Sequence, residues 1–248
     1  MSDIEPTIVS FHGADGCGKS TLARAFSREL EATRGTTSVM LGGSSYLDWL
    51  TPDIANQTIG PNHHFAEVAR TTEEKTRLYG EIAAVCYSYA GHLRNDKGVN
   101  VTIDSDPVLK RIIWNRLSTT GDASASYENQ FGEYILENVP ETAFPTAIVG
   151  VNISGEVDPD DIQARLTKRG GNSEYDPSSI EETQRICEKV TDIWDELQRA
   201  KLGLSGIRLF NTRFQPAELV SVTNADCHPN DIDANMVHSS RFIIGQLH

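Results

Sequence analysis

Short, mostly apolar segments alternate along the chain with longer stretches of helical periodicity. Five such segments lie at residues 6–11, 37–41, 99–104, 147–153 and 206–210. Buried parallel strands are typically continuous apolar runs of this length, bounded by glycine, proline or aspartate. The pattern therefore predicts five parallel strands.

The stretches between these segments carry apolar residues at helical spacing. The first follows Lys19, places Leu22, Phe26 and Leu30 on one face, and stops at Gly35. Further helices are predicted at about 65–93, 107–117, 127–138, 158–169 and 176–197. Strands that alternate with helices in this way form an α/β fold, here a five-stranded parallel sheet flanked by helices.

The chain of 248 residues is long enough for one large α/β domain. We expect this domain to cover residues 1–223, with a helical lid at about 155–178. Residues 224–248 have weaker periodicity and are predicted to form a C-terminal appendage.

Charge and composition narrow the range of partners. With 22 basic and 35 acidic residues the net charge is −13, which opposes broad binding of nucleic acid but allows a local basic cleft. The four cysteines are scattered and form no CxxC pair, which favours reduced thiols. The sequence has no run of about 18 apolar residues and no basic leader. We therefore expect a cytoplasmic protein without membrane contact, and a homodimer is compatible with the sequence.

The most informative motif follows the first apolar segment: Gly13, four variable residues, Gly18, Lys19 and Ser20. Between a strand and a helix, this spacing is the phosphate-loop pattern. Glycines let successive amide groups turn toward an anion, and the positive end of the helix adds attraction. We predict that Lys19 reaches the β- and γ-phosphates of a nucleotide and that Ser20 coordinates Mg²⁺. The predicted nucleotide-binding residues are Gly13, Ala14, Asp15, Gly16, Cys17, Gly18, Lys19, Ser20 and Thr21.

A basic helix end after the fourth predicted strand offers further positive charge. Arg165 and Arg169 stand four residues apart, so they share one helical face, and two glycines follow them. Two cations over a phosphate site suit charge stabilisation during phosphoryl transfer. The alternative is an ordinary solvated helix end, where basic residues are common.

The segment after residue 210 lacks the NKxD element that a GTPase would need.

In its Gly-x-Asp-Gly-x-Gly-Lys-Ser-Thr core, residues 13–21, the sequence resembles the thymidylate kinase branch of the P-loop kinases, which includes deoxynucleoside kinases. A long helix, a strand ended by aspartate and an arginine-bearing lid extend the resemblance over about residues 5–220. The resemblance implies a P-loop kinase fold and an ATP- and Mg²⁺-dependent kinase whose lid closes on the donor. Asp15 matches a position that contacts the acceptor sugar in that family, or it simply braces the turn.

The resemblance breaks down around the expected acceptor. Thymidylate kinases follow the third strand with Asp-Arg-aromatic, where this chain has Asp104, Ser105 and Asp106. Because the arginine that holds the acceptor's phosphate is missing, thymidine monophosphate is expected to be a poor acceptor. We expect an acceptor that presents a hydroxyl, or a phosphate held by cations from elsewhere, such as Arg70 or Arg77.

Two carboxylates stand where that arginine is missing. Asp104 ends a buried strand at the edge where ligands bind in such sheets, so we expect it to hold Mg²⁺ or accept a proton. Asp106 either contacts the acceptor or caps the next helix. Trp49 either lines a base pocket or belongs to ordinary core packing. The predicted catalytic residues are Lys19, Asp104, Arg165 and Arg169; the predicted metal ligands are Ser20 and Asp104; the predicted acceptor contacts are Asp15, Asp106 and Trp49.

Three functions are compatible with these features. The first is an ATP- and Mg²⁺-dependent phosphotransferase that acts on a nucleotide- or nucleoside-type acceptor. A second, within the same class, acts on a hydroxyl of a modified base in DNA or of another small molecule. The third is a non-catalytic ATP-binding regulatory module. The intact set of Lys19, Ser20, Arg165 and Arg169 disfavours the third function.

Overall fold

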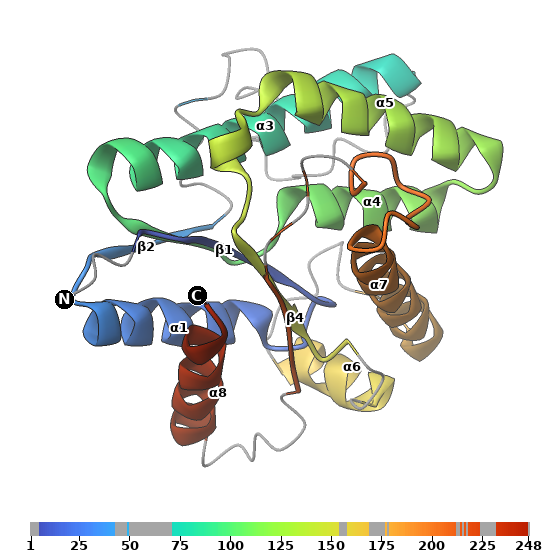
Figure 1. Ribbon diagram of the computed structural model, residues 1–248. Helices are drawn as coiled ribbons and strands as arrows, with labels where there is room; N and C mark the ends of the chain where they lie inside the picture. Colours follow the sequence, from blue (N-terminus) through green and yellow to red (C-terminus); the bar gives the residue numbers. More distant parts are fainter. Residues whose placement is uncertain are drawn as a thin grey trace.

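The centre of the computed structural model is a sheet of five parallel strands in the order β2-β3-β1-β4-β5 (Figure 1). The structure describes residues 5–42, 49, 71–153, 158–168, 177, 179–211, 214, 216, 218–223 and 232–247. The strands are β1 Ile8–His12, β2 Ser38–Leu41, β3 Asn100–Ile103, β4 Ala147–Val151 and β5 Glu218–Val222. The predicted α/β fold with a five-stranded parallel sheet flanked by helices is therefore confirmed.

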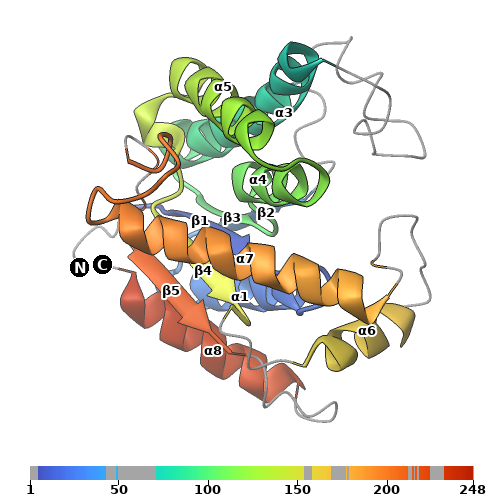
Figure 2. The same cartoon turned by 90° about the vertical axis from the view of Figure 1, so that its right-hand side faces the viewer.

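Helices cover both faces of the sheet. Figure 2 shows α3, α4 and α5 on one side of it and α1 and α8 on the other. Helix α7 packs against α4 and α6. The helices are α1 Lys19–Arg34, α3 Thr72–Lys97, α4 Pro107–Ser118, α5 Asp122–Asn138, α6 Pro159–Lys168, α7 Ile180–Ala200 and α8 Ile232–Gln246, with a 3-10 turn at Glu141–Ala143.

Local signals account for several helix ends. Helix α1 ends at Gly35, whose φ of 66° lets its amide bond to Glu31 O. Helix α3 begins with a capping box, in which the side chains of Thr71 and Glu74 each accept a bond from the other's backbone amide. The sequence predicted this helix to begin at about residue 65. Residues 65–70 lie outside the described residues, and Thr71 is the cap of α3.

The fifth strand was predicted in the wrong place. Residues 206–210 form turns, in which Phe210 N donates to Ile207 O at 3.0 Å. Their apolar side chains are buried by packing, with the rings of Phe210 and Phe214 5.4 Å apart. The fifth strand is β5, which pairs with β4. A short apolar run indicates that its residues are buried, but burial alone does not distinguish a strand from a packed turn.

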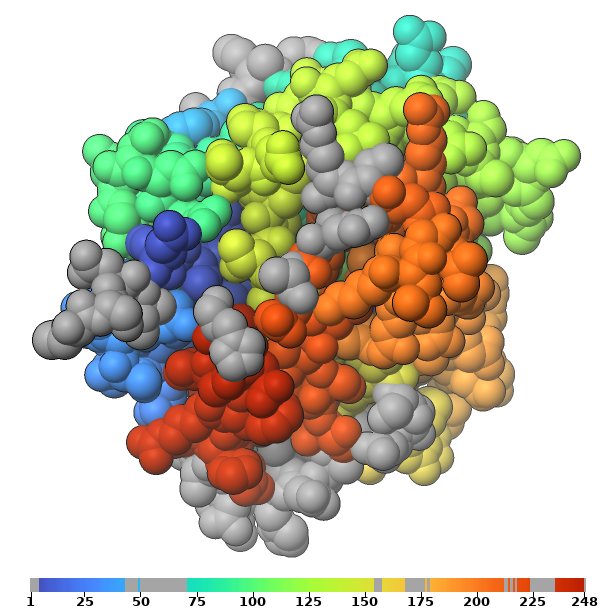
Figure 3. All heavy atoms as spheres, viewed as in Figure 1, coloured from blue at the N-terminus to red at the C-terminus, as the bar shows by residue number. Residues whose placement is uncertain are grey.

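The predicted C-terminal appendage, residues 224–248, contains α8. Helix α8 packs along α1 and buries Met236, Ser240 and Ile243. In the space-filling view its atoms meet those of α1 on a shared surface (Figure 3). The described part of the predicted appendage thus belongs to the main hydrophobic core. Residues 224–231 lie outside the described residues.

The order of the strands brings the functional segments together. Strand β1 lies between β3 and β4 and runs parallel to both, with Ser10 opposite Ile103 and His12 opposite Gly150. Parallel strands end at the same edge, so the loops after β1, β3 and β4 meet there. In open α/β sheets this edge is where ligands bind.

Candidate active site

The loop between β1 and α1 has a backbone that only glycine adopts easily. Gly16 and Gly18 have φ angles of 84° and 90°, which lie in the left-handed region that disfavours other residues. At Gly13 an added Cβ would stand 2.8 Å from Val151 O and from Cys17 Sγ. The motif's glycines are therefore required by the turn itself and by the close approach of β4.

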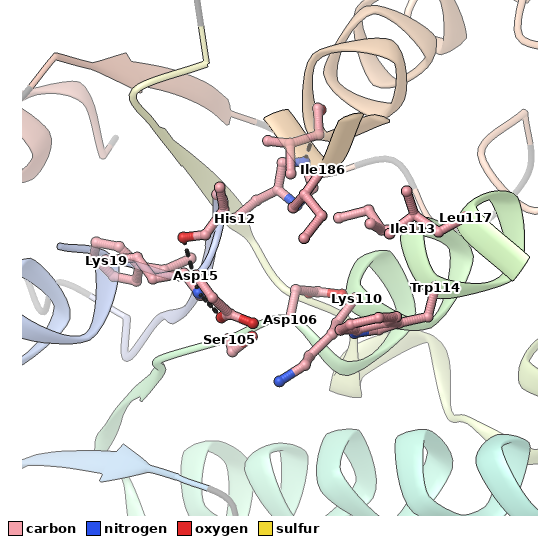
Figure 4. Close-up of a pocket in the computed structure, with 14 residues that line it drawn as sticks. His12, Asp15, Lys19, Ser105, Asp106, Lys110, Ile113, Trp114, Leu117 and Ile186 are labelled. Carbon is pink, nitrogen blue, oxygen red and sulfur yellow. Dashed lines mark hydrogen bonds and ion pairs between the residues drawn. The ribbon is translucent and has the colours of Figure 1, made fainter. Parts of the chain in front are cut away.

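Lys19 lies at the first position of α1 and is 7% exposed. Its Nζ donates to Asp15 Oδ1 at 2.6 Å and to Ala14 O at 3.2 Å (Figure 4). Burial lowers the pKa of Lys19, but Asp15, Cys17 and Asp104 together raise it above its ordinary value. The ammonium group is thus held positively charged inside the loop.

Asp104 directly follows β3, and its half-buried carboxylate lies near the start of α1. Burial raises the pKa of Asp104, while Lys19, Lys110 and the Ser20 hydroxyl act in the opposite direction. The structure therefore brings Lys19, Ser20 and Asp104 close together. Mg²⁺ favours a hydroxyl and a carboxylate of this kind, because it takes few protein ligands and completes its shell with water and phosphate oxygens. Among the described residues no group of three or more His, Cys, Asp or Glu side chains is placed to hold a metal.

Asp106 has a structural role in the described part of the chain. It is 1% exposed, and its Oδ1 accepts from the amides of Val108 and Leu109 at 3.0 and 2.9 Å. The Tyr87 hydroxyl lies 2.8 Å from Oδ2. Both oxygens are engaged inside the protein, so Asp106 caps α4. The residue also lines the pocket beside the phosphate loop, and its contact with an acceptor stays a prediction.

The ring of Trp49 packs against two side chains of α3. Its ring centroid is 4.8 Å from that of Tyr89 and 5.2 Å from that of His92, and the residue is 47% exposed. Trp49 is therefore not part of the hydrophobic core, and its assignment to a base pocket stays a prediction. Arg77 and Arg70 were the cations expected to hold an acceptor phosphate. Burial raises the pKa of Tyr134, and Arg77, which lies near it, acts in the opposite direction. Residue 70 lies outside the described residues.

Helix α6 carries Arg165 up to the phosphate loop. An added Cβ on Gly16 would stand 2.8 Å from Leu166 Cγ, so the loop and the helix are in direct contact. Burial raises the pKa of the Cys17 thiol, and Arg165 is among the cations that oppose this rise. Arg169 and most of the predicted lid after α6 lie outside the described residues.

Two residues that the sequence analysis missed brace the loop. Asn152 has a φ of 55°, and its Nδ2 donates to Cys17 O at 3.0 Å. His12 is buried, its Nε2 donates to Val190 O at 3.1 Å, and its ring stacks on Trp194. Burial lowers the pKa of His12 to about 4, so this imidazole is neutral at pH 7. A sequence signal exists only for Asn152, since asparagine tolerates the left-handed region.

A pocket opens beside the loop, between α4 and α7 (Figure 4). Asp15, Lys19, Ser105 and Asp106 line it at the loop end, so the structure places predicted site residues at one cavity. Its other walls come from α4 and α7, which the sequence analysis did not assign to the site. The wall residues are Lys110, Ile113, Trp114 and Leu117 of α4 and Ile186 and Val190 of α7.

Comparison with known proteins adds little to this geometry. No protein-family model matches the sequence, and no curated protein matches it. Among solved structures, the chain is similar to deoxyadenosine kinase from M. mycoides with bound dCTP, at 12% identity and a TM-score of 0.48, covering 96% of this chain and 98% of that one. At this identity and TM-score the similarity carries no functional argument. No helix in the described ranges is long and apolar enough to span a bilayer.

Proposed function

We propose that this chain is an ATP- and Mg²⁺-dependent phosphotransferase of the thymidylate kinase-like group of P-loop kinases. It transfers a γ-phosphoryl group to a nucleotide- or nucleoside-type acceptor other than ordinary thymidine monophosphate. The observation that carries the proposal is the buried, charged Lys19 inside a left-handed glycine loop, with Ser20 and Asp104 beside it. Such a site concentrates positive charge where a triphosphate would lie.

Each group has a defined task in this proposal. The loop amides and the amino end of α1 bind the phosphates, and Lys19 neutralises charge on the transferred group. Ser20 and Asp104 would hold Mg²⁺, which supplies further neutralisation of the phosphate oxygens. Arg165 would add charge from α6. Lys19 is held by Asp15 and Ala14 at 2.6 and 3.2 Å, so nucleotide binding exchanges at least one of these bonds for a phosphate oxygen.

Two further assignments belong to the same proposal. Of the described cysteines, Cys17, Cys86 and Cys187 are free thiols, which supports a reducing compartment such as the cytoplasm. Ser105 lies in the pocket without an adjacent arginine in the chain, which supports a weak response to thymidine monophosphate.

The test is an acceptor screen with γ-labelled ATP and Mg²⁺. Deoxynucleoside monophosphates, nucleosides and DNA are offered in parallel to the wild type and to Lys19→Ala. We expect label transfer to a nucleotide or nucleoside by the wild type alone. Transfer only to DNA would favour the modified-base kinase. ATP binding without transfer to any acceptor would favour the regulatory module and contradict the proposal.

A further inference from the structure

The C-terminal end of α7 and the turn that follows it carry two leucines on the protein surface. Leu202 is 74% exposed and Leu204 is 66% exposed, the largest fractions among the large apolar side chains that the structure describes. A single exposed leucine is ordinary, but neighbouring apolar side chains on a surface are a candidate interaction site. We call residues 195–204 the α7-end face. Figure 2 shows α7 on the outer side of the molecule.

The turn ends α7 with a Schellman motif. The amide of Leu204 donates to Arg199 O at 3.0 Å and that of Gly203 to Ala200 O at 2.9 Å, and Gly203 has a φ of 70°. In this motif an apolar residue at the position of Leu204 usually packs on the third or fourth residue from the helix end. Here those residues are Arg199 and Gln198. The usual apolar contact is therefore not available to Leu204, which agrees with its exposure.

Hydrogen bonds hold the turn in place behind the leucines. Ser205 Oγ donates to Glu196 Oε2 at 2.8 Å, and the amide of Gly206 donates to the same oxygen at 2.9 Å. The side chain of Asn211 accepts from Ser205 N at 3.2 Å and donates to Ser205 O at 2.6 Å. A surface that is already ordered loses little conformational freedom when it binds a partner. The two leucines are thus presented by a turn that is suited to docking.

A hollow lies beside the leucines. It holds about 280 Å³, compared with about 20 Å³ for the pocket beside the phosphate loop. Its described lining consists of Asp195, Gln198, Arg199 and Leu202, which all belong to one short segment. Among the described residues the hollow therefore has only one wall. An apolar side chain from a partner would bury Leu202 and fill the hollow.

The rim of the hollow carries one acid and one base. Asp195 and Arg199 are both exposed and stand one turn apart on the same face of α7. Arg199 also lies 3.8 Å from Glu196 Oε1. A two-fold axis brings a surface against its own copy, so the acid of each copy can face the base of the other. The α7-end face is self-complementary, because it offers a leucine and a hollow, and an acid and a base.

We propose that the α7-end face binds a second copy of this chain about a two-fold axis, with Leu204 of each copy seated in the hollow of the other. The face has ten residues, which is fewer than the about 20–30 residues a side of a standard stable interface. The dimer is therefore weak, with a Kd of about 10⁻⁵ to 10⁻⁴ M. The inference does not depend on the proposed function, and its test needs no nucleotide.

Sedimentation equilibrium of the full chain measures the association. Over about 1–500 µM protein the average mass should rise from 27.3 kDa toward twice that value. Leu202→Ser and Leu204→Ser should each raise the Kd by at least about tenfold, because the symmetry removes two side chains at once. Phe242→Ser is the matched control, since Phe242 is an exposed apolar side chain of α8 outside the face. This control should leave the Kd unchanged.

Charge reversal distinguishes a second copy from a different partner. Arg199→Asp leaves acids on both facing surfaces, so the Kd should rise by at least about fivefold, and by more at low salt. Combining it with Asp195→Arg restores one acid and one base on each face and should return the Kd to within about twofold of the wild type. Circular dichroism and urea unfolding at low protein concentration establish that each variant is folded.

Four results would overturn the inference. The first is a wild type that stays monomeric over the whole concentration range. The second is a Kd that neither leucine substitution changes, and the third is a Kd that Phe242→Ser raises as much as they do. The fourth is a double charge variant that dimerises no better than Arg199→Asp alone.

Discussion

The candidate site has two sides: the phosphate loop is shaped by backbone, and the pocket beside it is shaped by side chains. On the phosphate side, residues 13–19 are contiguous, and the shape of the loop comes from backbone, with Gly16 and Gly18 at φ angles of 84° and 90°. On the pocket side, the wall comes from side chains of α4 and α7, which are far apart in the sequence. A backbone cradle accepts few substitutions, because any side chain changes its shape. A side-chain wall can change its specificity while the sheet beneath it stays the same.

Removing Lys19 is the strongest test of the phosphate side. Lys19→Ala deletes one cation from a site formed mainly by backbone, so phosphoryl transfer should fall by about 100- to 1,000-fold while the fold persists. Steady-state transfer from labelled ATP, with circular dichroism of the variant, measures both. Lys97→Ala on α3 serves as control. Near-normal turnover in folded Lys19→Ala would remove the assignment of this loop.

A glycine substitution tests whether the loop depends on backbone shape. Gly16→Ala combines a φ of 84° with a Cβ that would stand 2.8 Å from Leu166 Cγ. We expect at least a tenfold loss in ATP affinity, together with a loss in the free energy of unfolding of about 3 kcal/mol from strain and overpacking.

Gly98→Ala is the matched control for that loss. Gly98 also has a positive φ, 65°, but no atom lies within 4 Å of an added Cβ. It should lose only about 1–2 kcal/mol of stability and leave ATP affinity unchanged, as chemical unfolding and calorimetric titration would measure. Equal effects of the two substitutions would mean that contact between the loop and α6 is unimportant.

The cap of α4 provides a test on the pocket side. Asp106→Ala removes the acceptor for two amides and leaves the buried Tyr87 hydroxyl without its partner. The free energy of unfolding should fall by about 2 kcal/mol. Asp106→Asn keeps an oxygen for the amides, so it should restore most of this stability in urea unfolding. An acceptor KM that rises in Asp106→Asn at full stability would support the predicted contact of Asp106 with the acceptor.

The sequence predicted the phosphate loop better than it predicted the features that depend on packing. The phosphate loop was predicted because its requirements are local: glycines at fixed positions, a lysine and a hydroxyl at the start of a helix. The fifth strand was misplaced because Ile207 and Phe210 are buried by packing in turns rather than by pairing. The capping role of Asp106 was one of two local alternatives, and the bonds from the amides of Val108 and Leu109 show it directly.

Contacts between residues far apart in the sequence left no usable pattern. Asn152 braces Cys17 from the end of β4, and the pocket wall joins Trp114 with Ile186. These contacts depend on how strands and helices are arranged in three dimensions. Periodicity reports that such residues are buried, but it does not report which partner they meet.

His12 joins the two sides of the site, and its titration gives the last prediction. Its Nε2 donates to Val190 O of α7, and burial lowers the pKa of His12 from 6.5 to about 4. The unfolded chain therefore binds a proton below pH 6.5 that the folded chain does not bind until about pH 4. Stability is fully present above the unfolded pKa and is lost as the pH falls toward the folded one.

Between pH 7.5 and pH 5 this linkage amounts to about 2 kcal/mol. Urea unfolding of the wild type and of His12→Asn at both pH values measures it, and His12→Asn should lose that much less stability over the interval. All other groups are shared by the two proteins, so the difference between their pH dependences belongs to His12. Identical pH dependences would mean that the imidazole is solvated in the folded protein. The bond to Val190 would then not tie the end of β1, which leads into the phosphate loop, to α7.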